Sequence, residues 1–265
     1  MYRKHFGLTR HPFGKEIPCD DLFASAASKE LEARLAHLLD LRGIGLVTGE
    51  SGSGKSSTCR KVVSALHAGL YRVFYVPLST GNAMDLYKSI AWEMGVPVER
   101  NRAALYRSIR TEATRLCLEA KVRPILIVDE AHHLRSELLE ELRLLTNYEM
   151  DSQNRLCLLL VGHAELRRRI GMAVHEALSQ RVVVRYHLPG LTREELPQYL
   201  AHLLHLAGCE VPLLEPPAIE AVFQATNGLP RKVNLLCQHA LIAAAGSRAK
   251  SVGIDHVQAA LAELT

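Results

Sequence analysis

GESGSGKSS, running from Gly49 to Ser57, fits the pattern G-x-x-x-x-G-K-[ST]. It follows the apolar run 44–48 and opens a stretch with helical spacing of apolar residues, and this strand–loop–helix context favours a phosphate-binding loop. Glycines let backbone N–H groups turn inward around phosphate oxygens, and the helix N-terminus adds positive potential. A chance Gly/Ser turn is the alternative, and the flanking strand and helix argue against it.

The residue types of this loop predict ATP and Mg²⁺ as cofactors. Lys55 can supply a point charge to the β and γ phosphates, and the Ser56 hydroxyl can ligate Mg²⁺. The residues expected to hold the nucleotide from this loop are Gly49, Glu50, Ser51, Gly52, Ser53, Gly54, Lys55, Ser56 and Ser57.

A second acidic motif follows an apolar strand. Residues 124–128 are apolar at every position, which is typical of a strand buried on both faces of a parallel sheet, and Asp129 and Glu130 follow directly. Ligands bind at the carboxyl ends of such strands. We therefore expect Asp129 to hold the Mg²⁺ hydration shell and Glu130 to orient and deprotonate the attacking water, which predicts ATP hydrolysis. A solvated strand end is the alternative.

The next residues extend this motif to the string DEAH, since Ala131 and His132 follow Glu130. That string invites a helicase interpretation. We set it aside because one sheet and a small helical domain are too short for two motor domains, and the later arginine-rich helicase motif is missing.

Strand-like and helical segments alternate up to about residue 190, which predicts a doubly wound α/β sheet. The expected strands are 44–48, 73–76, 124–128, 155–161 and 182–186; the expected helices are 28–41 with Ser28 as N-cap, 55–68, 83–95, 102–121, 134–148 and 171–179. Beyond 190 the pattern is helical only, over 192–207, 216–226, 230–246 and 254–264. We predict a lead-in 1–27 that packs on the nucleotide site, an α/β core 28–190 and a helical domain 191–265.

Composition narrows the class of protein. Lys plus Arg number 32 against 28 for Asp plus Glu, and the resulting net charge of +4 permits a nucleic-acid partner without requiring one. No apolar run approaches the roughly 18 residues that span a bilayer, and the N-terminus lacks the features of a signal peptide. The six cysteines form no C-x-x-C motif, which favours reduced thiols. We expect a cytoplasmic protein with no membrane partner.

The chain resembles AAA+ ATPases, and more closely the ExeA/TniB/TnsC-like group of bacterial AAA+ proteins. The resemblance covers nearly the whole chain, in the order that the group shows. It is carried by Phe6 to Phe13, Leu22-Phe23, the Gly49–Ser56 loop, Leu159 to Gly162, Gln180-Arg181 and Gly228-Leu229-Pro230-Arg231. It implies a P-loop NTPase (AAA+) parallel-sheet core with a C-terminal all-helical lid domain.

The resemblance also implies roles for three further residues. Arg181 is the candidate arginine finger, reaching the γ-phosphate held by a neighbouring subunit. Arg231 matches sensor 2, which contacts the same nucleotide from the lid. His163 occupies the sensor 1 place, where many AAA+ proteins have Asn, Ser or Thr. The alternative for Arg181 and for Arg231 is a surface arginine without a role at the nucleotide, and the alternative for His163 is a structural histidine. With these residues the expected catalytic set is Lys55, Glu130, His163, Arg181 and Arg231.

A basic segment is the candidate DNA surface. Residues 100–123 hold seven basic side chains, of which Arg100, Arg107 and Arg110 could share one helical face. We expect these three and Arg102 to contact the phosphate backbone of DNA. A solvated helix face is the alternative.

For the biological role, the resemblance implies three hypotheses. The favoured one is a regulator of DNA transposition, in which ATP orders subunits into a ring or helical filament on double-stranded DNA. This assembly recruits a transposase, with a target-selection protein as a further partner. ATP hydrolysis then releases the assembly from the DNA. A secretion-associated ATPase like ExeA is the alternative; such relatives carry a membrane span and a wall-binding domain, which a chain ending at Thr265 would lack. A loader-type nucleotide switch is the third.

Overall fold

The computed structural model describes residues 2–77 and 81–264. Contacts divide these residues into two compact units. The core unit holds residues 30–49 and 55–188, and the helical unit holds 2–29, 50–54 and 189–264. Part of the phosphate-binding loop, 50–54, therefore groups with the helical unit, while the residues on either side of it belong to the core unit.

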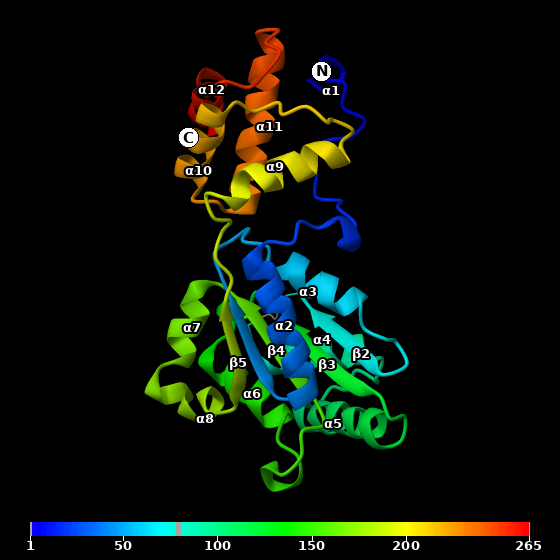
Figure 1. Ribbon diagram of the computed structural model, residues 1–265. Coiled ribbons are helices and arrows are strands. Elements are labelled where there is room, and N and C mark those ends of the chain that lie inside the picture. The colour runs from blue at the N-terminus through cyan, green and yellow to red at the C-terminus, as the bar shows by residue number, and fades with distance from the viewer. Residues whose placement is uncertain (1, 78–80, 265) are drawn as a thin grey trace. The chain divides into compact units, whose positions relative to one another are not determined.

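The core unit is built on a five-stranded sheet in the order β2-β3-β4-β1-β5, and every pairing is parallel (Figure 1). All residues of β1 and β4 are buried, because these inner strands are covered on both faces. The carboxyl ends of parallel strands share one edge, so β1 and β3 both end there, with β4 between them. The strands are β1 Ile44–Thr48, β2 Tyr71–Val76, β3 Arg123–Val128, β4 Cys157–Gly162 and β5 Val182–His187.

Helices cover this sheet, and their apolar faces complete the core. In α4 and α5 the buried residues recur at helical spacing, as in Leu86 and Ile90 or Leu105 and Ile109. The α-helices are α2 Ala26–Leu41, α3 Lys55–Ser64, α4 Ala83–Met94, α5 Arg102–Leu118, α6 Ser136–Leu145, α7 Ala164–Ile170 and α8 Glu176–Ser179. Short 3₁₀ turns lie at η2 Ala131–His133, η3 Glu149–Asp151 and η4 Ala173–His175.

The fold class is confirmed as α/β with a C-terminal helical region, and several details differ from the sequence prediction. Ser28 is not the N-cap of α2: the helix begins at Ala26, and the Ser25 hydroxyl accepts a hydrogen bond from the Ser28 N–H at 3.1 Å. Helix α3 ends at Ser64, where the predicted helix continued to 68. Helix α7 was not predicted, because its buried residues are only Leu166 and Ile170.

The helical unit has its own apolar core. Its elements are α1 Tyr2–His5, η1 Cys19–Asp21, α9 Glu195–Leu206, α10 Pro216–Thr226, α11 Pro230–Gly246 and α12 Ile254–Leu264. The lead-in contributes Tyr2, Leu8 and Phe13, which are buried among residues of these helices. The expected packing of the lead-in on the nucleotide site stays a prediction.

No helix within residues 2–77 and 81–264 combines the length and the apolar character needed to cross a lipid bilayer.

Candidate nucleotide-binding site

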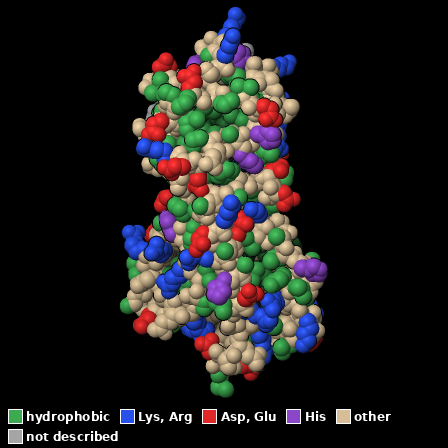
Figure 2. Space-filling view, in the orientation of Figure 1, with side chains coloured by type: hydrophobic (Ala, Val, Ile, Leu, Met, Phe, Trp, Pro, Cys, Tyr) green, Lys and Arg blue, Asp and Glu red, His purple; other side chains and the backbone are tan. Residues whose placement is uncertain are grey.

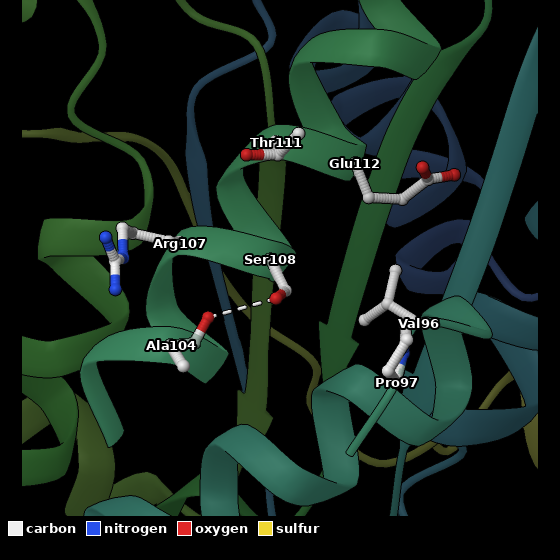
Figure 3. A pocket seen from close by; sticks show the side chains of 7 residues that line it. All are labelled: Val96, Pro97, Ala104, Arg107, Ser108, Thr111 and Glu112. Atoms are coloured by element: carbon white, nitrogen blue, oxygen red, sulfur yellow. Dashed lines mark hydrogen bonds between the residues drawn. The ribbon is translucent and has the colours of Figure 1, made fainter. Parts of the chain in front are cut away.

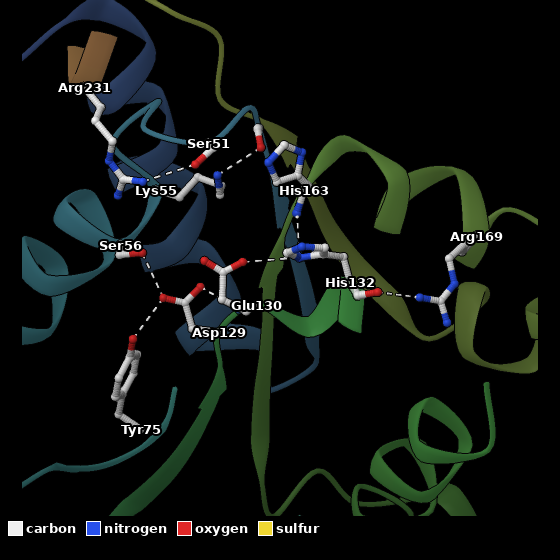
Figure 4. Close-up of polar contacts among 11 residues, drawn as sticks. Ser51, Lys55, Ser56, Tyr75, Asp129, Glu130, His132, His163, Arg169 and Arg231 are labelled. Atoms are coloured by element: carbon white, nitrogen blue, oxygen red, sulfur yellow. Dashed lines mark hydrogen bonds and ion pairs between the residues drawn. The ribbon is translucent and has the colours of Figure 1, made fainter. Parts of the chain in front are cut away.

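Asp129 joins the start of helix α3 to the end of strand β3 (Figure 4). Its Oδ2 accepts a hydrogen bond from the Ser56 hydroxyl at 2.8 Å and another from the Tyr75 hydroxyl at 2.9 Å. Asp129 is buried, with 6% of its surface exposed. A serine hydroxyl and a carboxylate are hard oxygen ligands of the kind that Mg²⁺ takes, so the predicted pair Ser56 and Asp129 fits that ion.

The loop before α3 is shaped for an anion. Gly52 and Gly54 have φ of +80° and +101°, conformations that residues with a Cβ rarely adopt. The Lys55 amine is buried and donates to the Gly49 carbonyl at 2.9 Å. The Ser53 hydroxyl is buried and has no hydrogen-bond partner in the part of the chain that the structure describes. A buried hydroxyl left without a partner fits a loop that receives phosphate oxygens.

Glu130 follows Asp129 and lies in a different environment. Its side chain is 53% exposed, and its backbone is left-handed at φ 52° and ψ 31°. Its own N–H donates to Asp129 Oδ1 at 2.8 Å, which fixes the turn between the two carboxylates. An exposed carboxylate directly after a buried one can reach a water molecule, as the predicted general base must.

His132 is the nearest partner of Glu130. Its Nδ1 lies 3.4 Å from Glu130 Oε2 and also 3.4 Å from the backbone nitrogen of His163. Burial, and next the neighbouring His133, lower the pKa of His132 from its ordinary value. The neutral imidazole that results can accept the N–H of His163 through Nδ1.

His163 stands at the start of helix α7, where its backbone is extended as in an N-cap residue. Its ring is 5.2 Å from that of His132, and its side chain is half-buried. The structure thus brings the residue at the sensor 1 place close to the Glu130–His132 pair. A catalytic role for His163 stays a prediction.

Arg181 lies just after α8 and pairs with Asp151, with 2.5 Å between the guanidinium Nη2 and the carboxylate Oδ2. The candidate arginine finger is therefore held by its own chain, on the strand β5 side of the core unit. Its proposed reach to a neighbouring subunit stays a prediction.

Arg231 contacts the phosphate-binding loop within the helical unit. Its backbone N–H donates to the Gly52 carbonyl at 3.2 Å, and its Nη1 donates to the Ser51 hydroxyl at 3.2 Å (Figure 4). A Cβ on Gly52 would lie 2.3 Å from the Cβ of Arg231, so only glycine permits this approach. Pro230 begins α11 and places Arg231 in its first turn. The contact brings the sensor 2 candidate to the loop that it is expected to serve.

The four arginines predicted to contact DNA do not form one free basic face. Arg102 pairs with Glu141. Arg110 lies 4.2 Å from the ring centre of Tyr148 and donates to a backbone carbonyl in the same unit. Arg107 lines an open hollow between α5 and the turn after α4 (Figure 3), and Arg100 is exposed. On the face shown in Figure 2, Lys and Arg side chains lie scattered among acidic and hydrophobic ones.

The sequence prediction missed Tyr75 and the contact of His132 with Glu130. Tyr75 is the second-last residue of strand β2, which pairs with β3 in parallel. Its place near the end of a strand was a signal, but only the strand order shows that β2 neighbours the strand that carries Asp129.

Comparison with known proteins identifies the family to which the chain belongs. A family model described as an AAA domain matches residues 38–170. General secretion pathway protein A of Aeromonas hydrophila is 34% identical over 247 residues, which is 92% of this chain and 45% of that protein. The chain thus spans less than half the length of this curated relative.

Solved structures share the fold. Cdc6p of Pyrobaculum aerophilum superposes with a TM-score of 0.72 at 16% identity, covering 95% of this chain and 70% of that chain. The Aeropyrum pernix ORC1 protein, solved in complex with DNA, superposes with a TM-score of 0.69 at 20% identity, covering 96% of this chain and 68% of that chain. At these identities the likeness concerns the fold alone. Among the three hypotheses for the role, the comparisons favour the secretion-associated alternative and give no support to transposition, a transposase or DNA as partner.

Proposed function

Since the chain belongs to the AAA domain family of P-loop ATPases, we propose that it hydrolyses ATP with the help of Mg²⁺. The main support is the 2.8 Å hydrogen bond from Ser56 to buried Asp129, beside the exposed carboxylate of Glu130. A hydroxyl, a buried carboxylate and an exposed second carboxylate are the parts that phosphoryl transfer to water requires at this place.

Each residue then has a task. Lys55 exchanges its bond to the Gly49 carbonyl for phosphate oxygens, and the Ser53 hydroxyl acquires a partner there. Ser56 and Asp129 hold Mg²⁺, which neutralises charge that develops on the phosphates. Glu130 accepts a proton from the attacking water and orients it.

We propose further that copies of the chain assemble and share sites. Arg181 leaves Asp151 to approach the nucleotide of a neighbouring copy, and Arg231 adds positive charge at the loop through its contact with Ser51 and Gly52. The AAA domain assignment supports this, because such ATPases typically act as oligomers. A ring and a helical filament are both compatible with the proposal.

The test is the turnover of Glu130→Gln. This variant keeps the size of the side chain and removes the base, so we expect ATP binding as in the wild type and turnover lower by about 10²–10⁴-fold. Glu99→Gln, at an exposed position away from the site, is the matched control and should leave both unchanged. Normal turnover by Glu130→Gln would remove Glu130 from the mechanism.

For the process served, we propose a secretion-associated role, in line with the alternative rather than with the transposition hypothesis. The support is the 34% identity to General secretion pathway protein A over 92% of this chain. Transposition on DNA rests on the order of motifs, and two of its four arginines, Arg102 and Arg110, are engaged within the chain.

Co-sedimentation with double-stranded DNA separates the two roles. With a non-hydrolysable ATP analogue, the secretion role predicts assembly that is independent of DNA, and no nucleotide-dependent pelleting with it. Nucleotide-dependent pelleting that is lost in the double variant Arg100→Ala and Arg107→Ala would overturn the secretion assignment in favour of the transposition hypothesis.

A further inference from the structure

We propose that Glu130, His132 and His133 form a binding site for a divalent transition-metal ion of the zinc class, next to the Mg²⁺ position at Ser56 and Asp129. The consequence for turnover that is drawn below rests on the proposed function of Glu130, whereas the binding itself does not.

The three side chains are gathered by one turn. Each offers a ligand atom, and these atoms all lie within 4.8 Å of one another. A tetrahedral site with metal–ligand bonds of about 2.1 Å needs ligand atoms about 3.4 Å apart. Glu130 Oε2 and His132 Nδ1 already have this separation, at 3.4 Å, and the metal would replace the long hydrogen bond that Nδ1 accepts from the His163 N–H. The His133 ring lies 4.0 Å from the His132 ring and is exposed, so a side-chain rotation can bring its nitrogen in.

The ligand set selects the class of ion. Two imidazoles and one carboxylate suit Zn²⁺, Co²⁺ and Ni²⁺, whereas Mg²⁺ prefers oxygen ligands throughout. The oxygen-only pair of Ser56 and Asp129 therefore suits Mg²⁺, and the mixed set suits a transition metal. The two ions would not compete for the same ligands.

The turn that carries the ligands is fixed from outside. Arg169 on α7 donates to the His132 carbonyl at 2.6 Å (Figure 4). It also donates to the Leu134 carbonyl at 2.6 Å. Ala131 and Leu134 are buried on either side of the two histidines. The bonds from Arg169 hold the backbone from which the two imidazoles extend. Three protein ligands leave a fourth position for water.

A metal ion in this site would arrest the ATPase. Coordination engages the Glu130 carboxylate, so it can no longer take a proton from the attacking water. Lys55 and Ser56 stay available to the nucleotide. The metal-bound protein should therefore behave like Glu130→Gln, holding ATP without turning it over.

Binding is tested first, on untagged, metal-stripped protein without nucleotide and in the presence of Mg²⁺. Titration with Co²⁺, followed by its visible absorption, should show one bound ion per chain. Loss of a hydrogen bond that supports a metal ligand costs about 10–100-fold in metal affinity. Loss of the ligand itself, in His133→Gln, should therefore weaken Co²⁺ binding by about 100-fold or more. His239→Gln is the matched control, because His239 lies outside the cluster and pairs with a glutamate, Glu263, at 3.2 Å, as His132 does with Glu130.

Equal Co²⁺ binding by wild type and His133→Gln, or no binding by the wild type, would overturn the site. Inhibition is then measured with Zn²⁺ against each protein's own zinc-free rate. We expect wild-type turnover to fall by about 100-fold, the lower range of a general base's contribution, and His133→Gln to be spared at the same concentration. Metal binding without any ATPase activity in zinc-free Mg²⁺ buffer would refute the proposed function while leaving the metal site intact.

Discussion

Removing the hydroxyl of Tyr75 should destabilise the nucleotide-free protein by about 1.5 kcal/mol, the lower value for a hydrogen bond to a charged group. In Tyr75→Phe the buried Asp129 carboxylate keeps the bond from Ser56 at 2.8 Å and loses the bond from Tyr75 at 2.9 Å. The lower value applies because Tyr75 is 44% exposed, so water can replace part of the lost contact. At about 2–4 °C per kcal/mol for a domain of this size, the Tm should fall by about 3–6 °C.

Thermal unfolding at neutral pH measures this, with Tyr71→Phe as the control on the same strand. The Tyr71 hydroxyl accepts a long bond from Arg123 at 3.3 Å, and the guanidinium also lies over the ring, a contact that Phe keeps, so loss of the hydroxyl should cost about 0.5 kcal/mol. Tyr75→Phe unfolding at the temperature of Tyr71→Phe or above would refute the assigned support of Asp129.

The pH dependence gives a second readout for Tyr75. Burial, and then the bond to Asp129, raise its pKa from 10.0 to about 12, so the folded state favours the protonated hydroxyl. The stabilisation is complete below the unfolded value of 10.0 and is lost as pH rises through about 12. The difference between wild type and Tyr75→Phe should therefore shrink over that range.

Three other changes test separate parts of the structure. Gly228→Ala should lower the free energy of unfolding by about 2 kcal/mol or more in chemical denaturation, because φ is +67° and a Cβ there would lie 2.0 Å from a backbone carbonyl oxygen. The control Gly246→Ala, with no atom within 4 Å of its Cβ, should be neutral or stabilising. Tyr148→Phe should be neutral or stabilising at pH 7, since the buried hydroxyl lacks a hydrogen-bond partner among the described residues. Burial raises the pKa of Tyr148 to about 12, so the wild type should lose more stability than the variant as pH rises from about 10 through 12. Arg181→Ala should keep ATP binding and lose about 10³-fold of the turnover of the assembled protein, and mixing it with Lys55→Ala should restore part of that turnover.

The sequence predicts the elements that it specifies locally. Residues 124–128 are apolar throughout and 44–47 carry no polar side chain, and both runs lie in strands of the buried part of the sheet. Helix α7 was missed because its seven residues include three consecutive arginines and bury two side chains, too few to show a period. The sequence prediction placed the cap of α2 at Ser28, and only the structure shows that the Ser25 hydroxyl accepts the Ser28 N–H.

In the candidate site, too, the residues set by local sequence motifs were predicted and the contacts set by the fold were not. The loop pattern and the acidic strand end predict that Ser56 and Asp129 meet, and the structure places them 2.8 Å apart. The neighbours Tyr75 and His132 could not be predicted, since their contacts depend on strand order and on the left-handed backbone of Glu130. The pairing of Arg181 with Asp151 was hidden for the same reason, because it joins a helix end to a distant turn.

Calorimetric titration of the purified chain with ATP and Mg²⁺ tests the central claim most directly, with Lys55→Ala titrated in parallel. The account predicts saturable binding to the wild type that requires the amine now bonded to Gly49, and therefore loss of binding in Lys55→Ala. Absence of binding to the wild type, or equal affinity in both proteins, would contradict it.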